Sequence, residues 1–568
     1  MRTELDGRMD AVMGVLAGAT GDLKLTTVER DGRSYPLIGA APPALPHYFA
    51  HFCAEHRDAE FLVAGEERLT FGAVYAQAQA VARALVAGFG VERGDRVGIA
   101  MRNSPSWIAL YMGIVMAGGV ATLLNGWWQT EELGGAVADV DCRLVFADPP
   151  RAARLAALPF PPRTVEIDDL APLAEALRPV TAHDAAGAGL PALDGDALAT
   201  ILFTSGSTGQ SKGALSDHRA VVQAVFNYLA QAMMMVAIAT QDGKAPEGQP
   251  CTMLNLPLFH VTADVPIFLQ SFAMGRKLVL MPKWDAKEAM RLIERERVSY
   301  FVGVPLMSYE LLNHPERDRF DLSTVTDFAA GGAPRPVEHV RRLDEEMTGS
   351  PLIGYGLTET NGIGTGNWRS NYTAKPNSCG PASRPLVDLA ILDGNGRPVE
   401  QGERGEVGIR TVANFREYWG RPEATAAAFT ADGYFLTGDI GYLDEDGYLY
   451  IVDRKKDIII RGGENISCQE VEAALYQHPG VAEAAVFGLA DERLGEVPGA
   501  VIHLAEPGSL EAEDVTAFLY QHIAAFKVPA RLWFADAPLP RLGTEKIDKV
   551  ALRTHYRALA TAEPSPAT

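Results

Sequence analysis

Cysteine is scarce in this chain. The 568 residues include five cysteines, an odd number, scattered without any CxxC spacing: Cys53, Cys142, Cys251, Cys379 and Cys468. Structural disulfides and cysteine metal sites need paired or clustered cysteines, so the sequence argues against both.

Basic residues are also in the minority. Lysine and arginine together number 51 against 72 aspartates and glutamates, which gives a formal net charge of −21 and a pI near 5.1. General nucleic-acid binding requires a basic face, so we expect no nucleic-acid partner. The acidic total does not exclude anionic small substrates, because these are held by local donors.

Long apolar runs are missing as well. No apolar run approaches the ~20 residues required to span a bilayer. Residues 1–30 lack the basic start, unbroken apolar core and cleavage site of a secretory leader. We therefore expect a soluble, cytoplasmic protein with no membrane span.

The chain does have a repeated rhythm of short apolar strands and helices. A strand at 96–101, a helix at 105–117 and a strand at 120–124 are followed later by strands at 199–203, 252–255, 277–280 and 300–304. This alternation predicts βαβ units and an α/β fold whose parallel sheet is covered on both faces. After Gly380, short strands with Gly/Asp turns predict a small antiparallel barrel or sheet. From Asp457, a compact α+β module of about a hundred residues follows.

The stretch 198–214, LATILFTSGSTGQSKGA, has the composition of a phosphate-binding loop. After a buried strand come three glycines, five hydroxyl side chains and Lys212. Glycines allow several N–H groups to turn towards one anion, while hydroxyls and a lysine add donors and charge. It is not a Walker A loop, because Ser211 precedes Lys212 and Gly213 follows it. The alternative is a flexible Gly/Ser linker, which would not normally follow an apolar strand.

Two further stretches follow predicted strands. They are GGAP at 331–334 and YGLTETNG at 355–362. Tyr355 offers a flat face for a base, Thr358 offers a hydroxyl for a phosphate, and Glu359 is a hard oxygen ligand suited to magnesium. Alone, these stretches would more often be an ordinary loop.

The last two stretches are weak signals in isolation. Within 435–466, Asp439 is placed to accept two ribose hydroxyls, whereas residues 444–446 suggest a solvated hairpin tip. The basic segment from Arg454 could be a solvated linker. Lys546 lies in the turn-rich segment PRLGTEKIDK, where a lone lysine means nothing by itself.

Taken together, these motifs resemble the adenylate-forming superfamily, which includes acyl-CoA synthetases, aryl-CoA ligases, firefly luciferase and peptide-synthetase adenylation domains. TSGSTGQSKG, GGAP, YGLTE, TGD, DRKKD with GGENI, and the late lysine of GTEKID occur in the family's order over residues 60–553. The resemblance implies that a carboxylate attacks the α-phosphate of ATP to give an acyl-AMP. A thiol, usually that of coenzyme A, then displaces AMP.

The resemblance also implies roles for individual residues. The β and γ phosphates would be held by Thr204, Ser205, Gly206, Ser207, Thr208, Gly209 and Lys212, and adenine by Gly331, Gly332, Ala333, Pro334, Tyr355 and Gly356. Thr358 would contact the α-phosphate, Glu359 would carry Mg2+, and Asp439 with Arg454 would hold the ribose. Lys546 would bridge the carboxylate and α-phosphate oxygens. His260, in PLFH, matches a position of the family motif at the acyl pocket, although a lone histidine is more often a packed structural residue.

In this family the C-terminal module moves between the two steps. We expect an α/β protein with a large N-terminal domain of two βαβ-layered subdomains plus a small β-barrel, and a smaller, mobile α+β C-terminal domain. The predicted boundaries are 1–453 for the large domain, 454–458 for a hinge centred on Lys456, 459–560 for the module and 561–568 for a disordered tail. After rotation, the loop with Gly462 and Gly463 would line a pantetheine channel.

The expected substrate is a hydrophobic carboxylic acid, either a medium- or long-chain fatty acid or an aryl-alkanoic acid. The pocket should be lined by 228–235, 302–307 and 361–364, where no carboxylate or arginine occupies an obvious pocket position. Gly126 stands where many relatives have proline, which affects packing more than chemistry. Ile460 stands where some relatives carry a lysine that assists thioester formation.

Three alternatives stay open. The acyl group could pass to a carrier protein, although no extra segment follows YGLTE as it usually does in such ligases. The chain could be a non-catalytic nucleotide-binding protein, which the joint presence of Lys212, Glu359 and Lys546 disfavours. A luciferase-like oxidation uses the same fold. A homodimer is a further possibility.

Overall fold

The computed structural model describes residues 2–204, 211–454, 457–461, 464–491, 493–506, 508, 510–542 and 546–562. The chain divides into two compact units. The first comprises Met1–Leu389, Ile409–Phe435 and Asp446–Tyr448, and the second comprises Ala390–Gly408, Leu436–Glu445 and Leu449–Thr568. The predicted boundaries, with a hinge at 454–458, stay a prediction.

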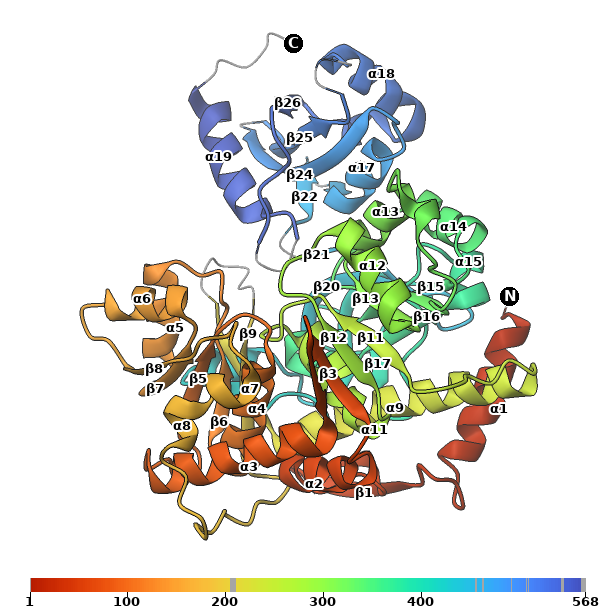
Figure 1. Cartoon of the computed structure of the whole chain (residues 1–568). Coiled ribbons are helices and arrows are strands. Elements are labelled where there is room, and N and C mark those ends of the chain that lie inside the picture. The colour runs from red at the N-terminus through yellow and green to blue at the C-terminus, as the bar shows by residue number, and fades with distance from the viewer. Residues whose placement is uncertain are drawn as a thin grey trace. The chain divides into compact units, whose positions relative to one another are not determined.

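A seven-stranded sheet forms one layer of the first unit (Figure 1). Its strands are, in spatial order, β19 (Glu417–Tyr418), β10 (Gly213–Asp217), β9 (Leu198–Phe203), β6 (Val120–Leu123), β5 (Arg96–Ala100), β7 (Leu144–Ala147) and β8 (Arg163–Glu166). The strands from β9 to β8 run parallel to one another, whereas β10 folds back antiparallel on β9. The predicted strands at 96–101, 120–124 and 199–203 are thus confirmed, and β10 is an addition.

An eight-stranded sheet forms the second layer of this unit. Its strands are β16 (Thr365–Trp368), β15 (Ser350–Tyr355), β14 (Asp327–Gly331), β13 (Tyr300–Gly303), β11 (Cys251–Leu254), β12 (Lys277–Leu280), β3 (Glu60–Ala64) and β4 (Glu67–Thr70). The six central strands are parallel, and the two edge strands are antiparallel. A separate hairpin joins β1 (Leu25–Arg30) to β2 (Arg33–Ile38).

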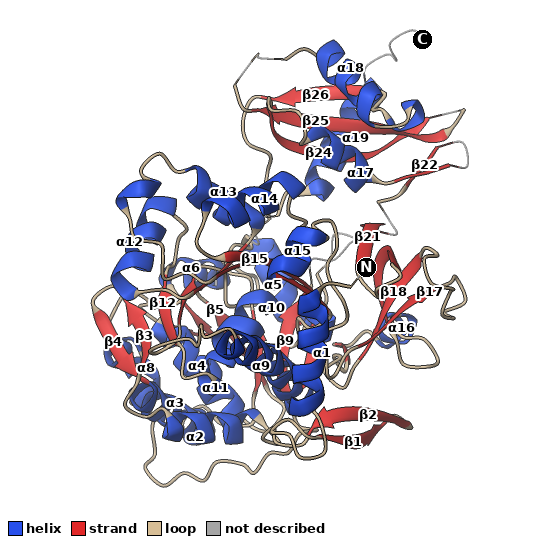
Figure 2. Cartoon of the chain, turned by 90° about the vertical axis from the view of Figure 1, so that its right-hand side faces the viewer, coloured by secondary structure: helices blue, strands red, loops and turns tan. Residues whose placement is uncertain are grey.

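Helices surround both sheets, as Figure 2 shows in blue. The longer ones are α1 (Glu4–Leu16), α2 (Leu45–Glu55), α3 (Phe71–Ala87), α4 (Pro105–Met116), α5 (Thr130–Asp139), α6 (Pro149–Ala156), α9 (His218–Gln241), α12 (Ala286–Glu296), α13 (Pro305–Asn313) and α14 (Val337–Glu346). The shorter ones are α7 (Leu173–Ala176), α8 (Arg178–Thr181), α10 (Val261–Ala263), the π-helix η1 (Asp264–Leu269), α11 (Gln270–Ala273), η2 (Arg317–Arg319), η3 (Thr358–Thr360), α15 (Arg369–Ala374) and α16 (Pro422–Ala427).

Helix α4 shows how the sequence builds the core of this unit. The Ser104 side chain caps it by accepting a hydrogen bond from the Trp107 N–H, and Pro105 occupies its first turn, where no N–H is needed. Every residue of α4 is buried, and α4 packs against α3. A Cβ at Gly113 would lie 2.4 Å from Val81 Cγ1, so this glycine permits the close approach of the two helices.

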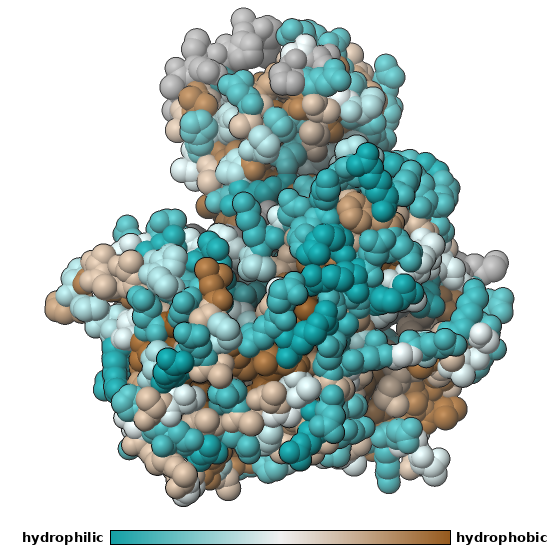
Figure 3. Space-filling view, viewed as in Figure 1, coloured by the Kyte–Doolittle hydropathy of each residue, from teal (hydrophilic) through white to brown (hydrophobic). Residues whose placement is uncertain are grey.

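Helix α9 is the one helix among the described residues that is long and apolar enough to cross a membrane by length and composition. In its 18-residue apolar window, 67% is buried inside the protein, as expected of a core helix. The surface that faces the viewer in Figure 3 is mainly hydrophilic, in keeping with the net charge. The interior position of α9 therefore explains its hydropathy.

The second unit contains two sheets. A four-stranded sheet, most of which lies in this unit, orders β17 (Asp388–Leu392), β18 (Gly405–Arg410), β20 (Phe435–Leu443) and β21 (Leu449–Arg454). A five-stranded sheet contains β22 (Ile459–Arg461), β23 (Glu464–Ile466), β24 (Val481–Asp491), β25 (Gly495–Leu504) and β26 (Arg531–Ala535). The unit's helices are α17 (Cys468–Leu475), α18 (Ala512–His522), η4 (Ala525–Lys527) and α19 (Lys549–Ala562).

The five-stranded sheet is buried on both faces. On β24, Ala484 and Val486 belong to a core cluster with residues of α17 and α18, whereas Ala485 and Phe487 belong to a cluster with Leu552 of α19. Successive strand residues point to opposite faces, so helices cover both sides of this sheet. The predicted compact α+β module is confirmed. The predicted tail lies outside the described residues from 563 onwards.

Candidate active site

The loops after β14 and β15 lie side by side at one edge of the eight-stranded sheet. These two strands are parallel, and Gly331 is the register partner of Gly354. The predicted adenine-binding stretch 331–334 therefore starts beside Tyr355 and Gly356 at the end of β15. Ligands in α/β proteins usually bind at the carboxyl ends of parallel strands. The fold thus brings both predicted stretches to such an edge.

Glycine is required at two positions of these loops. Gly332 has a φ of +79°, in the left-handed region that glycine adopts without strain. A Cβ at Gly356 would lie 1.9 Å from the carbonyl oxygen of Gly362. The chain can therefore turn back on itself here only without a side chain.

Glu359 is fixed from two directions. It lies in the short helix η3 and its side chain is buried. Its Oε1 accepts a hydrogen bond of 2.7 Å from the Tyr418 hydroxyl, and its main-chain carbonyl accepts one of 2.7 Å from the Phe415 N–H. Thr358, the first residue of η3, is half-buried. The predicted metal carboxylate therefore has a defined position beside the predicted phosphate contact.

The predicted phosphate-binding loop connects β9 to β10. The Thr204 N–H donates to the Lys212 carbonyl at 2.9 Å and closes the base of this hairpin. The Lys212 ammonium lies 4.7 Å from the centre of the Tyr418 ring. Lys212 and Glu359 lie far apart in the sequence. They nevertheless contact one tyrosine side chain, Lys212 at the ring face and Glu359 at the hydroxyl.

Tyr418 contacts two predicted site residues and was not itself predicted from the sequence. Burial raises the pKa of its hydroxyl, and the neighbouring Glu359 carboxylate raises it further, so the phenol stays a hydrogen-bond donor. Its position depends on the pairing of β19 with β10. No local pattern reveals a contact between segments so far apart in the chain.

The three predicted acyl-pocket stretches meet near the same sheet edge. The Tyr228 hydroxyl on α9 donates to the Gly362 carbonyl at 2.6 Å. The stretch 302–307 follows β13, which is paired with β14. Ile363, Val302 and Met307 are all buried. Apolar side chains therefore dominate the described part of this region.

His260 has a structural contact in this region. Its Nδ1 accepts a hydrogen bond of 3.2 Å from the Thr262 N–H and so caps α10. A Cβ at Gly331 would lie 3.8 Å from Thr262 Cγ2. His260 thus caps a helix beside the predicted adenine stretch, and its role at the acyl pocket stays a prediction.

A buried carboxyl group follows His260 by four residues. Asp264 begins the π-helix η1, and neither of its carboxyl oxygens has a hydrogen-bond partner among the described residues. Burial raises its pKa well above the ordinary value, because a charged carboxylate is disfavoured away from water. The hydroxyl of Tyr111, whose pKa is raised first by burial and then by Asp264, also has no described partner. The sequence analysis did not identify this pair.

Asp439, Arg454 and Lys546 come together in the second unit. Asp439 on β20 is the register partner of Arg454 on β21, and their side chains form an ion pair of 2.6 Å. The pKa of Lys546 is lowered from 10.5 to about 8, chiefly by burial and then by the Arg454 charge, whereas Asp439 opposes the shift. The predicted catalytic ammonium is therefore close enough to the predicted ribose pair for their charges to interact.

Eight predicted site residues lie outside the described residues. They are Ser205, Gly206, Ser207, Thr208, Gly209, Lys456, Gly462 and Gly463. Their roles stay predictions.

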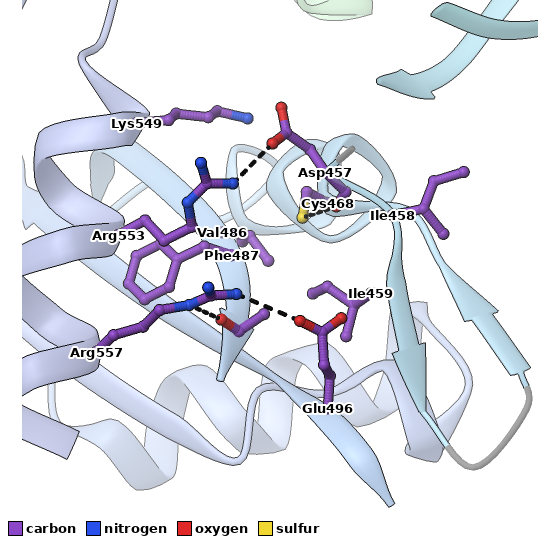
Figure 4. A pocket seen from close by; sticks show the side chains of 11 residues that line it. Asp457, Ile458, Ile459, Cys468, Val486, Phe487, Glu496, Lys549, Arg553 and Arg557 are labelled. Atoms are coloured by element: carbon purple, nitrogen blue, oxygen red, sulfur yellow. Dashed lines mark hydrogen bonds and ion pairs between the residues drawn. The ribbon is translucent and has the colours of Figure 1, made fainter. Parts of the chain in front are cut away.

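A small cavity lies in the second unit next to the predicted hinge. Its volume of about 20 Å³ is enough for one water molecule. Figure 4 shows Arg553 directed towards Asp457, with which it forms an ion pair of 3.1 Å, and Arg557 directed towards Glu496. The Cys468 thiol also donates to the Asp457 carbonyl. Asp457, at the end of the predicted hinge, is thus bound to α19 and α17, and the cavity is too small for a substrate.

Magnesium would have few ligands from the protein. No group of three or more His, Cys, Asp and Glu side chains in the described part of the chain could hold a metal ion. Mg2+ usually keeps several waters and is bound through one or two carboxylates plus substrate phosphates. The fixed, hard carboxylate of Glu359, which accepts from Tyr418, fits that arrangement.

Comparison with known proteins places this geometry in a family. The profile of the AMP-binding enzymes matches residues 49–419, and that of the AMP-binding enzyme C-terminal domain matches residues 470–546. A long-chain-fatty-acid–CoA ligase of Mycobacterium tuberculosis is 34% identical over 86% of this chain and 94% of its own length. A feruloyl-CoA synthase of Amycolatopsis sp. is 33% identical over 87% of this chain and 95% of its own length.

The fold agrees with a solved structure of the same kind. The crystal structure of ATP-bound MatB from Rhodopseudomonas palustris has a TM-score of 0.78 and 28% identity to this chain, and the match covers 90% of this chain and 99% of that one. The non-catalytic alternative is therefore set aside. The chain belongs to the AMP-binding, adenylate-forming enzymes and is an AMP-forming acid–CoA ligase.

Proposed function

We propose that this enzyme activates a hydrophobic carboxylic acid, either a medium- or long-chain fatty acid or an aryl-alkanoic acid, with ATP and Mg2+, and transfers the acyl group to coenzyme A. The observation that carries the proposal is the meeting of the predicted nucleotide and acyl stretches at the ends of β13, β14 and β15. The buried apolar side chains of Val302, Met307 and Ile363 favour an apolar acyl chain. The two curated relatives compared above are named for a fatty acid and for an aryl acid.

In the first step, a carboxylate oxygen of the substrate attacks the α-phosphorus of ATP, and the bond to the β-phosphate oxygen breaks to release pyrophosphate. The protein contributes position and charge stabilisation, without a covalent intermediate. Lys212 and the loop before it hold the β and γ phosphates. Thr358 contacts the α-phosphate, and the stretch 331–334 with Tyr355 holds adenine. Bound through Glu359, Mg2+ would neutralise negative charge on the phosphates.

The second unit supplies the group that acts on the reacting oxygens. Asp439 and Arg454 hold the ribose, and the Lys546 ammonium lies between the substrate carboxylate and the α-phosphate oxygens, where charge is redistributed. In the second step, the thiolate of coenzyme A attacks the acyl carbon and AMP leaves. We propose that the module turns about Lys456 between the steps and that Gly462 and Gly463 then line the pantetheine channel.

A pyrophosphate-release screen over fatty, aryl-alkanoic and amino acids tests the substrate class. We expect release with the first two groups and none with amino acids. Release with amino acids alone would contradict the proposed acid. Product analysis with coenzyme A and with a carrier protein decides the acceptor, and the exposed Ile460, in place of an assisting lysine, makes that comparison informative.

A lysine substitution tests the proposed mechanism. Lys546→Ala should abolish acyl-AMP formation and retain ATP binding. Lys527→Ala is the matched control, because Lys527 is a lysine of the same module whose ammonium pairs with Glu470. Unchanged acyl-AMP formation in Lys546→Ala would exclude the role assigned to this lysine.

A further inference from the structure

Strand β19 fixes the main chain of Tyr418 beside the phosphate loop. Tyr418 is the register partner of Ala214, two residues after Lys212. The N–H of Trp419 donates to the Gly213 carbonyl at 2.8 Å, and the N–H of Arg416 donates to the Leu215 carbonyl at 2.7 Å. The tyrosine is therefore held by backbone pairing, whatever its side chain contacts.

The side chain of Tyr418 contacts two groups from different sheets. The Lys212 ammonium lies over its ring, 4.7 Å from the ring centre, which is a favourable cation–π arrangement. Its hydroxyl donates to Glu359 Oε1 at 2.7 Å. Lys212 precedes β10 of the seven-stranded sheet, whereas Glu359 follows β15 of the eight-stranded sheet. One tyrosine thus links the two predicted phosphate-handling stretches.

We propose that Tyr418 is a positioning residue. Its hydroxyl orients the Glu359 carboxylate for Mg2+, and its ring holds the Lys212 ammonium. The inference rests on the proposed function of these two residues. An ionised carboxylate has about four acceptor sites, so accepting from Tyr418 and binding a metal ion are compatible. Removal of an outer hydrogen-bond partner typically weakens metal affinity about 10- to 100-fold.

ATP binding without an acid substrate provides a readout free of turnover. Calorimetric titrations with ATP are run in EDTA and at a series of Mg2+ concentrations. Tyr418→Phe removes the hydroxyl and keeps the ring, so the Mg2+ concentration for half-maximal enhancement of ATP binding should rise about tenfold or more. ATP affinity in EDTA should stay unchanged, because the contact with Lys212 is preserved. Tyr434→Phe is the matched control, since this tyrosine donates to the Asp388 carboxylate at 2.9 Å in another place.

A second substitution separates the ring from the hydroxyl. Tyr418→Met removes both, so it should raise the Mg2+ requirement and also weaken ATP binding in EDTA. Both variants lack the hydroxyl, so either one that folds tests whether the hydroxyl affects the Mg2+ requirement. Thermal unfolding establishes which variants are folded. In a Glu359→Gln background, Tyr418→Phe should have no further effect on the Mg2+ requirement, because the group that it orients is already lost.

The outcomes separate this inference from the proposed function. If wild-type protein shows no Mg2+-dependent ATP binding, the assignment of Glu359 itself is wrong. If wild type shows it and Tyr418→Phe has the same Mg2+ requirement, or loses ATP affinity equally with and without Mg2+, the positioning role of Tyr418 is refuted.

Discussion

The lowered pKa of Lys546 makes the pH dependence of adenylation a direct test of its role. Burial and Arg454 lower this pKa from 10.5 to about 8, a loss of about 3 kcal/mol in the preference for the charged form. The ammonium would then be about 90% charged at pH 7, half charged at pH 8 and about 10% charged at pH 9. Because the proposed step needs the charged form, the rate should fall about tenfold between pH 7 and pH 9.

The assay must report the free enzyme. We would measure kcat/KM for ATP with the acid saturating and coenzyme A absent. This ratio reports the pKa values of groups in the enzyme that has not yet bound ATP. Pyrophosphate is measured at fixed times, so that no coupling enzyme contributes its own pH profile. Leaving out coenzyme A removes the titration of its thiol from the same pH range.

Two variants test whether Lys546 causes the fall in rate at alkaline pH, the alkaline limb of the pH profile. Lys546→Arg keeps a charge that is not lost below about pH 12, so this variant should be slower but should not decline above pH 8. Arg454→Met removes a neighbouring positive charge, so the limb should move to higher pH while KM for ATP rises. An alkaline limb that persists unchanged in Lys546→Arg would refute the reasoning, because another group would then be titrating.

Three further changes probe other parts of the structure. Burial raises the pKa of Asp264, so the folded state keeps a proton that the unfolded chain loses above about pH 4. Stability from this group therefore falls as pH rises, and Asp264→Asn should raise the thermal midpoint more at pH 8 than at pH 5; an equal change at both would contradict this. The Tyr448 hydroxyl donates to the buried Asp6 at 2.7 Å. Tyr448→Phe should cost about 1–3 kcal/mol of stability, seen as a lower thermal midpoint, and no change would mean that the bond contributes nothing. Gly356→Ala forces a Cβ against the Gly362 carbonyl. This variant should lose ATP binding in calorimetry while staying folded, and normal affinity would show that the loop can relax.

Local patterns were enough to predict several core strands and one buried helix. The apolar run of β9 and the α4 sequence, with its Ser-Pro start, carry their own signals, and both elements form where predicted. The same holds for the C-terminal module, where the alternation along β24 fills two separate core clusters. In each case, the determining contacts are either within the element or follow from which face is apolar.

Contacts between distant segments could not be predicted in this way. The sequence suggested a solvated hairpin tip at 444–446, yet Asp446 forms an ion pair of 2.7 Å with Lys375, and only 10% of its side chain is exposed. Charged residues such as Asp446 suggest solvent exposure unless a partner is known, and its partner lies about seventy residues away.

The charged groups of the candidate site have partners within the protein itself. Lys212 lies over an aromatic ring, Glu359 accepts from a hydroxyl, and Arg454 pairs with Asp439. Each of these groups can make more than one such contact, because an ammonium has three donors, a guanidinium five and a carboxylate about four acceptor sites. Nucleotide binding would therefore add ligands to groups that are already oriented and would not have to order free side chains. Such fixed charges stabilise a transition state without reorganisation during the reaction. A substitution that frees one of them should consequently slow adenylation even where the charge itself is kept.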